Sequence, residues 1–88
     1  MLMKKVVINN KYGLQSKTAA VFIHKASNYK SSIWVEKGER KANAKSLLGL
    51  LSLGIQEGDT IVLTAEGEDA EEAANELEKY LVSENEEE

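Results

Sequence analysis

Few residues in this sequence could carry chemistry. The chain has no cysteine and a single histidine, His24. These counts exclude disulfides, thiolate metal ligands and a cysteine nucleophile, and they argue against a histidine-based metal site or catalytic triad. Two short polar segments remain: the stretch from Gln15 to Thr18, and the pair Lys45-Ser46. A serine hydroxyl accepts phosphoryl groups, so covalent modification is the chemistry that these residues favour.

Ser46 stands directly before a run with five leucines in seven positions. These are Leu47, Leu48, Leu50, Leu51 and Leu53. A surface helix needs one apolar stripe for the core, so we expect Leu50 and Leu53 to be buried and Leu48 and Leu51 to be substantially exposed. Two interpretations stay open at this stage. The run is either a deeply embedded helix or a helix that presents a protein-docking patch.

Ser46 itself also has two interpretations. As the N-cap of the leucine-rich helix, its hydroxyl accepts a hydrogen bond from a backbone N–H, and that role alone explains a serine here. The same position suits a phosphoryl group, because the positive end of the helix dipole faces it and Lys41 and Lys45 are near in sequence. Any N-cap serine fits this description.

The spacing of apolar residues predicts seven elements in the order β-α-β-β-α-β-α. The predicted strands cover residues 2–9, 32–37, 40–44 and 61–65, and the predicted helices cover 16–27, 46–53 and about 70–81. Asp69 and Glu72 resemble a capping box for the last helix. We expect an α+β fold, with a four-stranded, mainly antiparallel sheet and three helices on one face. Strand 2–9 forms an exposed edge, which would allow a homodimer by strand exchange.

Composition and charge limit the classes of function. The chain has 88 residues, 42% hydrophobic and 30% charged, so we expect one domain over residues 1–83 followed by an acidic, frayed tail at 84–88. No apolar run reaches the ~18 residues of a membrane span, and no signal peptide is evident, so a cytoplasmic location is expected.

The charge is divided unevenly along the chain. Residues 1–64 hold ten Lys and Arg against four acids, a net charge of +6. Residues 65–88 hold eleven acids against Lys79, a net charge of −10. The basic part could attract an acidic protein, a phosphate or a nucleic acid. Direct binding to nucleic acid is the weakest of these, because the five aromatic residues are scattered.

Three motifs resemble the HPr family, the histidine-containing phosphocarriers of the bacterial sugar phosphotransferase system. They are GLQSKTAA at 13–20, NAKSLLGLLSL at 43–53 and AEGED at 65–69. The resemblance covers residues 3–82 and implies an open-faced β-sandwich. It also implies a phosphohistidine at the position of Gln15, with arginine and proline at the positions of Lys17 and Thr18.

An amide nitrogen is not nucleophilic, so Gln15 removes the phosphocarrier chemistry of the family. His24 lies nine residues further along the predicted helix, about 13 Å away, and is expected to be a solvated side chain. Lys17 keeps the charge of the missing arginine without its planar fork. Thr18 lacks the ring by which proline would preset the first helical turn.

The pattern is most similar to the catabolite repression HPr-like proteins, which carry glutamine at this position and retain a regulatory serine, matched here by Ser46. The resemblance implies phosphorylation of Ser46 by HPr kinase/phosphorylase, after which the protein would bind catabolite control protein A as its corepressor. The expected partner-binding residues are Gln15, Lys17, Ala20, Lys45, Leu47, Leu48 and Leu51. We expect a non-enzymatic protein with no catalytic residue, cofactor or metal.

Two alternatives remain open. A working phosphocarrier would need a phosphoryl acceptor other than Gln15. A binding module for a metabolic enzyme would use the same leucines without any phosphorylation.

Overall fold

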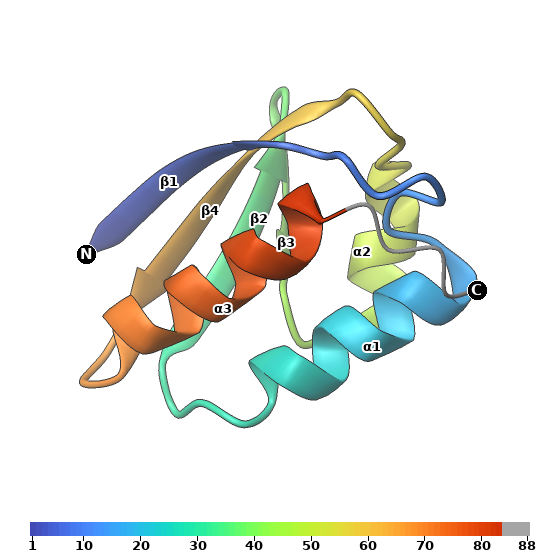
Figure 1. Cartoon of the computed structure of the whole chain (residues 1–88). Coiled ribbons are helices and arrows are strands. Elements are labelled where there is room, and N and C mark those ends of the chain that lie inside the picture. Colours follow the sequence, from blue (N-terminus) through green and yellow to red (C-terminus); the bar gives the residue numbers. More distant parts are fainter. Residues whose placement is uncertain (84–88) are drawn as a thin grey trace.

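The computed structural model describes residues 1–83 and contains the seven predicted elements in the predicted order (Figure 1). The elements are β1 (Leu2–Val7), α1 (Ser16–Ala26), β2 (Ser32–Lys37), β3 (Arg40–Asn43), α2 (Leu47–Leu53), β4 (Thr60–Glu66) and α3 (Ala70–Val82). The acidic tail expected at 84–88 lies outside the described residues. Within residues 1–83, no helix is long and apolar enough to cross a membrane.

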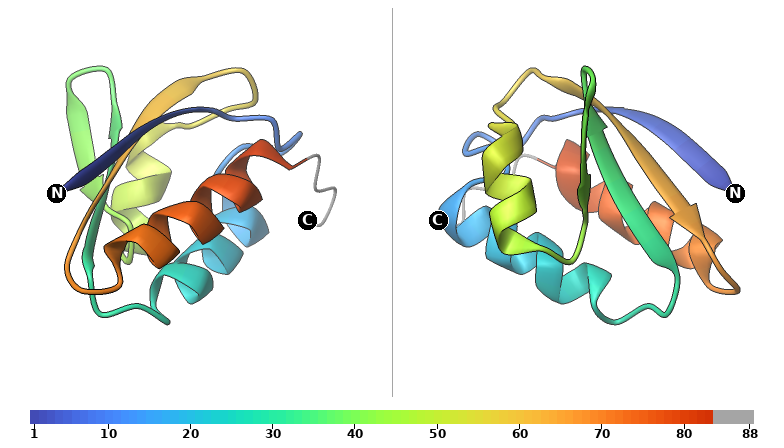
Figure 2. Two further views of the ribbon diagram at one scale, coloured as in Figure 1. Left: turned by 60° about the vertical axis from the view of Figure 1, so that its left-hand side comes forward. Right: turned by 180° about the vertical axis from the view of Figure 1, so that it is seen from behind.

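The four strands form one antiparallel sheet in the order β1-β4-β2-β3. The three helices all cover the same face of this sheet (Figure 2), so the predicted open-faced α+β fold is confirmed. The strand β1 lies at one edge of the sheet, as expected. A homodimer formed through this edge stays a prediction.

Several predicted boundaries were wrong by one or two residues. The first strand ends at Val7 instead of residue 9, because the backbone N–H of Asn9 donates to the Leu81 carbonyl at 2.9 Å rather than to the sheet. The side chain of Asn10 then accepts from the Tyr12 N–H at 2.9 Å, which closes the following turn. The chain therefore leaves the sheet earlier than its β-rich composition suggests.

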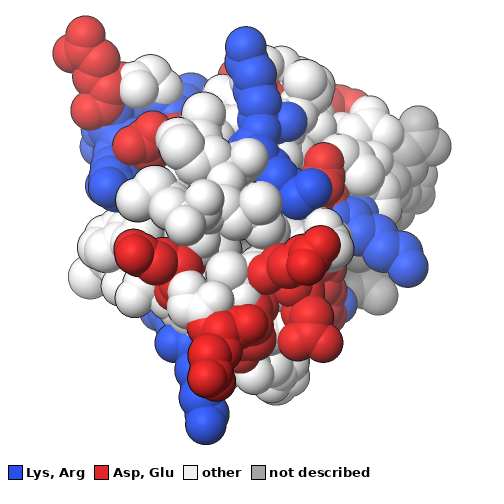
Figure 3. Space-filling model, turned by 90° about the vertical axis from the view of Figure 1, so that its left-hand side faces the viewer, with Lys and Arg blue, Asp and Glu red and all other residues white. Residues whose placement is uncertain are grey.

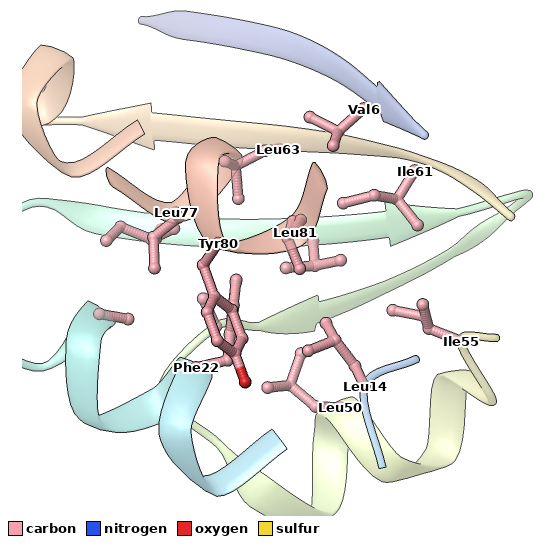
Figure 4. Packing of buried hydrophobic residues seen from close by; sticks show 14 of the residues in the cluster. Val6, Leu14, Phe22, Leu50, Ile55, Ile61, Leu63, Leu77, Tyr80 and Leu81 are labelled. Carbon is pink, nitrogen blue, oxygen red and sulfur yellow. The ribbon is translucent and has the colours of Figure 1, made fainter. Parts of the chain in front are cut away.

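Side-chain alternation along the strands separates a core face from an open face. Val6, Ile61 and Leu63 point toward the helices and meet Leu77 and Leu81 of α3 (Figure 4). On the open face, Met3 and Val7 are more than half exposed. Trp34, the only tryptophan, lies on this face with the Lys41 Nζ 5.0 Å from its ring centroid. The period of two in a strand thus directs the core to one side.

The helix α2 presents its leucines to two different environments. Leu50 and Leu53 are buried, with 0% and 4% of their surface exposed. Leu48 is 81% exposed and Leu51 39% exposed, and Leu47 is also exposed. The prediction for these leucines is confirmed, and the interpretation as a deeply embedded helix was wrong. A seven-residue helix packed on one side cannot bury both stripes.

The loop between α1 and β2 is fastened to the start of α3 by Asp69. Its carboxylate accepts hydrogen bonds from the backbone N–H groups of Lys30 at 2.9 Å and Ser31 at 3.0 Å, and from the Ser31 hydroxyl. The predicted capping box was therefore wrong, since the Asp69 side chain makes no bond to its own helix. The Ser31 hydroxyl, followed by the Lys30 N–H, holds the pKa of Asp69 below its ordinary value.

Two further contacts bring this loop close to α3. A Cβ at Gly67, whose φ is +147°, would lie 2.5 Å from the Ser31 Oγ, so only glycine permits the approach. The Tyr29 hydroxyl donates to the Glu76 carboxylate, and this bond raises the pKa of Tyr29 to about 12. The AEGED motif thus has a structural role in this fold: Gly67 leaves room for Ser31, and Asp69 accepts hydrogen bonds from it.

We predict that Asp69→Asn lowers the melting temperature at pH 7, because an amide cannot replace the charge-assisted bonds of the carboxylate. The lowered pKa means that the ionised carboxyl stabilises the folded state above its ordinary pKa of 3.8 and loses this effect as pH falls below that value. The difference from the wild type should therefore shrink as pH is lowered. Thermal unfolding at several pH values measures it. Glu68→Gln is the control, and a difference independent of pH would contradict the assignment.

We also predict that Leu50→Ala destabilises the protein by about 2–5 kcal/mol, because it leaves a cavity in the core. Leu51→Ala should cost much less, since its side chain already contacts water. Urea unfolding of the two variants tests this comparison. Equal losses of stability would mean that Leu51 belongs to the core.

Candidate functional site

The first turn of α1 is closed by Thr18. Its Oγ1 donates to the Gln15 carbonyl at 2.7 Å and accepts from the Gln15 N–H at 3.1 Å. Thr18 is buried, and between these two residues Ser16 takes a left-handed φ of +52°. Thr18 therefore orders the turn by hydrogen bonding in place of a proline ring. Apolar periodicity does not reveal this role, but a threonine three residues after Gln15, the N-cap of α1, is a usable signal.

The start of α1 and the end of α2 meet at the carbonyl of Ile55. This oxygen accepts from the Leu14 N–H at 3.1 Å and from the Gln15 Nε2 at 3.4 Å. A Cβ at Gly13 would lie 2.3 Å from the same oxygen, and the φ of Gly13 is +64°. A close approach with a left-handed backbone requires glycine. The exposed Gln15 side chain is thereby held beside the end of α2.

Ser46 is the N-cap of α2, as predicted. Its backbone is extended, and its Oγ accepts from the Gly49 N–H at 3.2 Å. The side chain is neither fully buried nor fully exposed. The hydroxyl thus has a structural partner and remains at the surface. Phosphorylation of this hydroxyl stays a prediction.

The two lysines expected to flank Ser46 are engaged elsewhere. The Lys45 Nζ donates to the carbonyls of Tyr29 at 2.7 Å and Ser31 at 3.1 Å. The Lys41 Nζ lies over the Trp34 ring on the open face of the sheet. Both lysines are near Ser46 in sequence, as noted, but their ammonium groups bind these other partners instead of the Ser46 hydroxyl. Lys45 instead fixes the segment before α2 to the α1–β2 loop.

Exposed residues of α1 and α2 form the candidate surface. The two helices pack against each other behind the sheet (Figure 2). Gln15, directly before α1, is exposed, as are Lys17 and Ala20 on α1 and three leucines on α2. We call this set, with Ser46, the α1–α2 surface: Gln15, Lys17, Ala20, Ser46, Leu47, Leu48 and Leu51. His24 is exposed in the last turn of α1, as expected for a solvated side chain.

The α1–α2 surface contains no carboxylate, whereas acids gather elsewhere. Figure 3 shows Asp and Glu side chains clustered over the lower part of the face that holds the end of β4 and the start of α3. The acids of this region are Glu66, Glu68, Asp69, Glu71 and Glu72. The charge asymmetry of the sequence is therefore also an asymmetry of the described surface. The area at α1 and α2 is therefore apolar at its leucines, and its charge is that of Lys17.

The candidate site is a surface rather than a cleft. A shallow hollow of about 300 Å³ lies between α1 and α3 and is lined by Lys25, Glu76, Lys79, Tyr80 and Ser83. It includes neither Gln15 nor Ser46. Groups of side chains that could hold a metal ion are absent from residues 1–83. The arrangement at α1 and α2 suits contact with another protein.

Comparison with known proteins gives close relatives over nearly the whole chain. A family model described as the PTS HPr component phosphorylation site matches residues 2–83. The HPr-like protein Crh of Bacillus subtilis (strain 168) is 40% identical over 84 residues, covering 96% of this chain and 99% of that protein.

Solved structures agree with the fold. The phosphocarrier protein HPr from Bacillus anthracis str. Ames superimposes with a TM-score of 0.89 at 41% identity, covering 91% of this chain and 95% of that one. The crystal structure of Bacillus subtilis Crh, described as an intertwined dimer with a swapped domain, gives a TM-score of 0.74 at 41% identity, covering 92% and 93%. With a family match from residue 2 to residue 83, this chain belongs to the HPr family.

Proposed function

We propose that this protein is a regulatory, non-enzymatic HPr-like protein that is phosphorylated on Ser46 by HPr kinase/phosphorylase. In the phosphorylated form it binds catabolite control protein A as corepressor in carbon catabolite repression. The observation that carries the proposal is the position of Ser46, whose hydroxyl begins a helix with three exposed leucines. A partner could bind the phosphate with its own basic groups and the leucines in an apolar pocket.

The chemistry of position 15 supports a regulatory role. The family's phosphocarrier function needs a nucleophilic imidazole there, and Gln15 offers an amide whose nitrogen donates to the Ile55 carbonyl. The only histidine, His24, lies at the other end of α1. Regulation through Ser46 needs no nucleophile at position 15. The relative Crh is named HPr-like rather than a phosphocarrier, which agrees with this interpretation.

The proposed cellular compartment follows from the need for ATP. The proposed phosphorylation consumes ATP, so we place the protein in the cytoplasm.

The protein partner is expected to contribute the basic groups that neutralise the phosphate, because the Lys45 ammonium already binds two carbonyls. Lys17 is exposed and remains available for contact with a partner.

A working phosphocarrier is the main alternative, and Gln15 distinguishes it. We predict that the wild-type protein accepts no phosphoryl group from phosphoenolpyruvate through Enzyme I, because it lacks the acceptor imidazole. Gln15→His should restore part of the transfer. Lys17, which lacks the planar fork of arginine, should keep the rate below that of a normal phosphocarrier. Radiolabelling with phosphoenolpyruvate measures both proteins. Labelling of the wild type near one phosphate per chain would overturn the regulatory proposal.

We predict that HPr kinase/phosphorylase and ATP phosphorylate the wild type once and leave Ser46→Ala unmodified. The variant should still fold, with a loss of about 1 kcal/mol from the missing cap. Mass spectrometry of the treated proteins gives the site and the stoichiometry. Ser52→Ala serves as a control on the same helix and should be modified like the wild type. Equal modification of the wild type and Ser46→Ala would show that another residue is the acceptor.

The second alternative is a module that binds a metabolic enzyme without phosphorylation. The same variants separate it from the leading proposal. Binding to catabolite control protein A should require both the kinase treatment and Ser46. A partner that binds the untreated wild type and the untreated Ser46→Ala variant equally would favour the phosphorylation-independent module.

A further inference from the structure

Gly49 is an unusual residue for the middle of α2. Glycine destabilises a helix interior relative to alanine, because its backbone is freer in the unfolded chain. The backbone of Gly49 is ordinary helix and does not require a glycine, unlike the left-handed Gly54 that ends α2. The reason for glycine at this position must therefore lie in its surroundings.

The surroundings of Gly49 leave little space for a side chain. A Cβ there would lie 3.2 Å from the Ala42 Cβ on β3, 3.2 Å from the Ser46 Oγ and 3.5 Å from the Ser46 Cβ. The two crowded neighbours differ in kind. A small movement of α2 away from β3 would relieve the contact with Ala42. The contact with Ser46 lies within one turn of the same helix, so a movement of the whole helix would not relieve it, and the Ser46 side chain itself would have to shift.

From this geometry, and resting on the proposed phosphorylation of Ser46, we infer that Gly49 is a specificity-determining residue that keeps the Ser46 hydroxyl open to phosphoryl transfer. In that reaction the Ser46 Oγ forms a bond to the γ-phosphorus of ATP, and its proton passes to a base on the kinase. The bond from that phosphorus to the bridging oxygen breaks, which releases ADP. The phosphoryl group that replaces the hydroxyl proton needs free volume beside the Oγ. The missing Cβ of Gly49 provides it.

A purely structural explanation of Gly49 would rest on Ala42 alone. In that case Gly49→Ala impairs the protein by pushing α2 away from β3, and removal of the Ala42 methyl group should repair it. If the crowded atom is the Ser46 Oγ, the Ala42→Gly/Gly49→Ala double variant stays impaired. The two explanations therefore give opposite results for the same double variant.

The kinase assay with ATP tests this difference. Gly49→Ala should be phosphorylated at least tenfold more slowly than the wild type while its circular dichroism spectrum is retained. The Ala42→Gly/Gly49→Ala variant should remain slow, and Ser52→Ala should match the wild type within twofold. A wild-type rate for Gly49→Ala, or recovery of the rate in the double variant, would overturn the inference. If the wild type itself is not phosphorylated, the proposed function fails instead.

A second measurement needs no kinase. With phosphoserine installed at position 46 during translation, Gly49→Ala should lower the melting temperature more than it does with serine at 46, because the phosphoryl group and the new methyl group compete for one space. Equal decreases would show that Gly49 does not hold this space. If Gly49→Ala does not fold, the same comparison is made in the Ala42→Gly background.

Discussion

The carbonyl oxygen of Ile55 holds the start of α1 against the end of α2, and the α1–α2 surface depends on this junction. One oxygen accepts from the Leu14 backbone and from the Gln15 side chain, and the approach is close enough that Gly13 has no room for a Cβ. Residues 40 positions apart in sequence are thereby placed side by side. The two helices also pack against each other, and the junction adds a direct hydrogen bond between the start of α1 and the residue after α2. Gln15 is thereby held beside the helix that carries the exposed leucines.

The sequence predicted the elements well because their signal is periodic. Apolar spacing located the seven elements, and the leucine density of α2 predicted which of its side chains face water. The contacts that were missed join a side chain to a distant backbone. Asp69 binds a loop 38 residues away, and Lys45 binds carbonyls 14 and 16 residues away. Polar bonds of this kind have no period, so local patterns assigned Asp69 to its own helix and Lys45 to Ser46. The bond between Thr18 and Gln15 spans only three residues and could have been anticipated.

The candidate site differs from that of an HPr phosphocarrier at Gln15, whereas the hydrogen bonds around it still hold the helices in place. Gln15 retains a hydrogen-bonding side chain at the start of α1 but has no group that attacks phosphorus. Around it, the α1–β2 loop is fastened by Asp69 from α3 and by Lys45 from the segment before α2. These bonds position the helices whatever the residue at position 15. The loss of one chemistry therefore leaves the α1–α2 surface in place, as the proposed regulatory role requires.

The position of Trp34 determines what optical spectroscopy can observe in this protein. The indole lies on the open face of the sheet beneath the Lys41 ammonium, while the helices cover the opposite face. Because it is the only tryptophan, its emission follows the integrity of the sheet. A ligand that settles on α1 and α2 approaches from the other side of the molecule and does not touch the fluorophore. Intrinsic fluorescence is thus suited to following unfolding of the sheet, whereas contact at α1 and α2 is better followed by a label attached near α2.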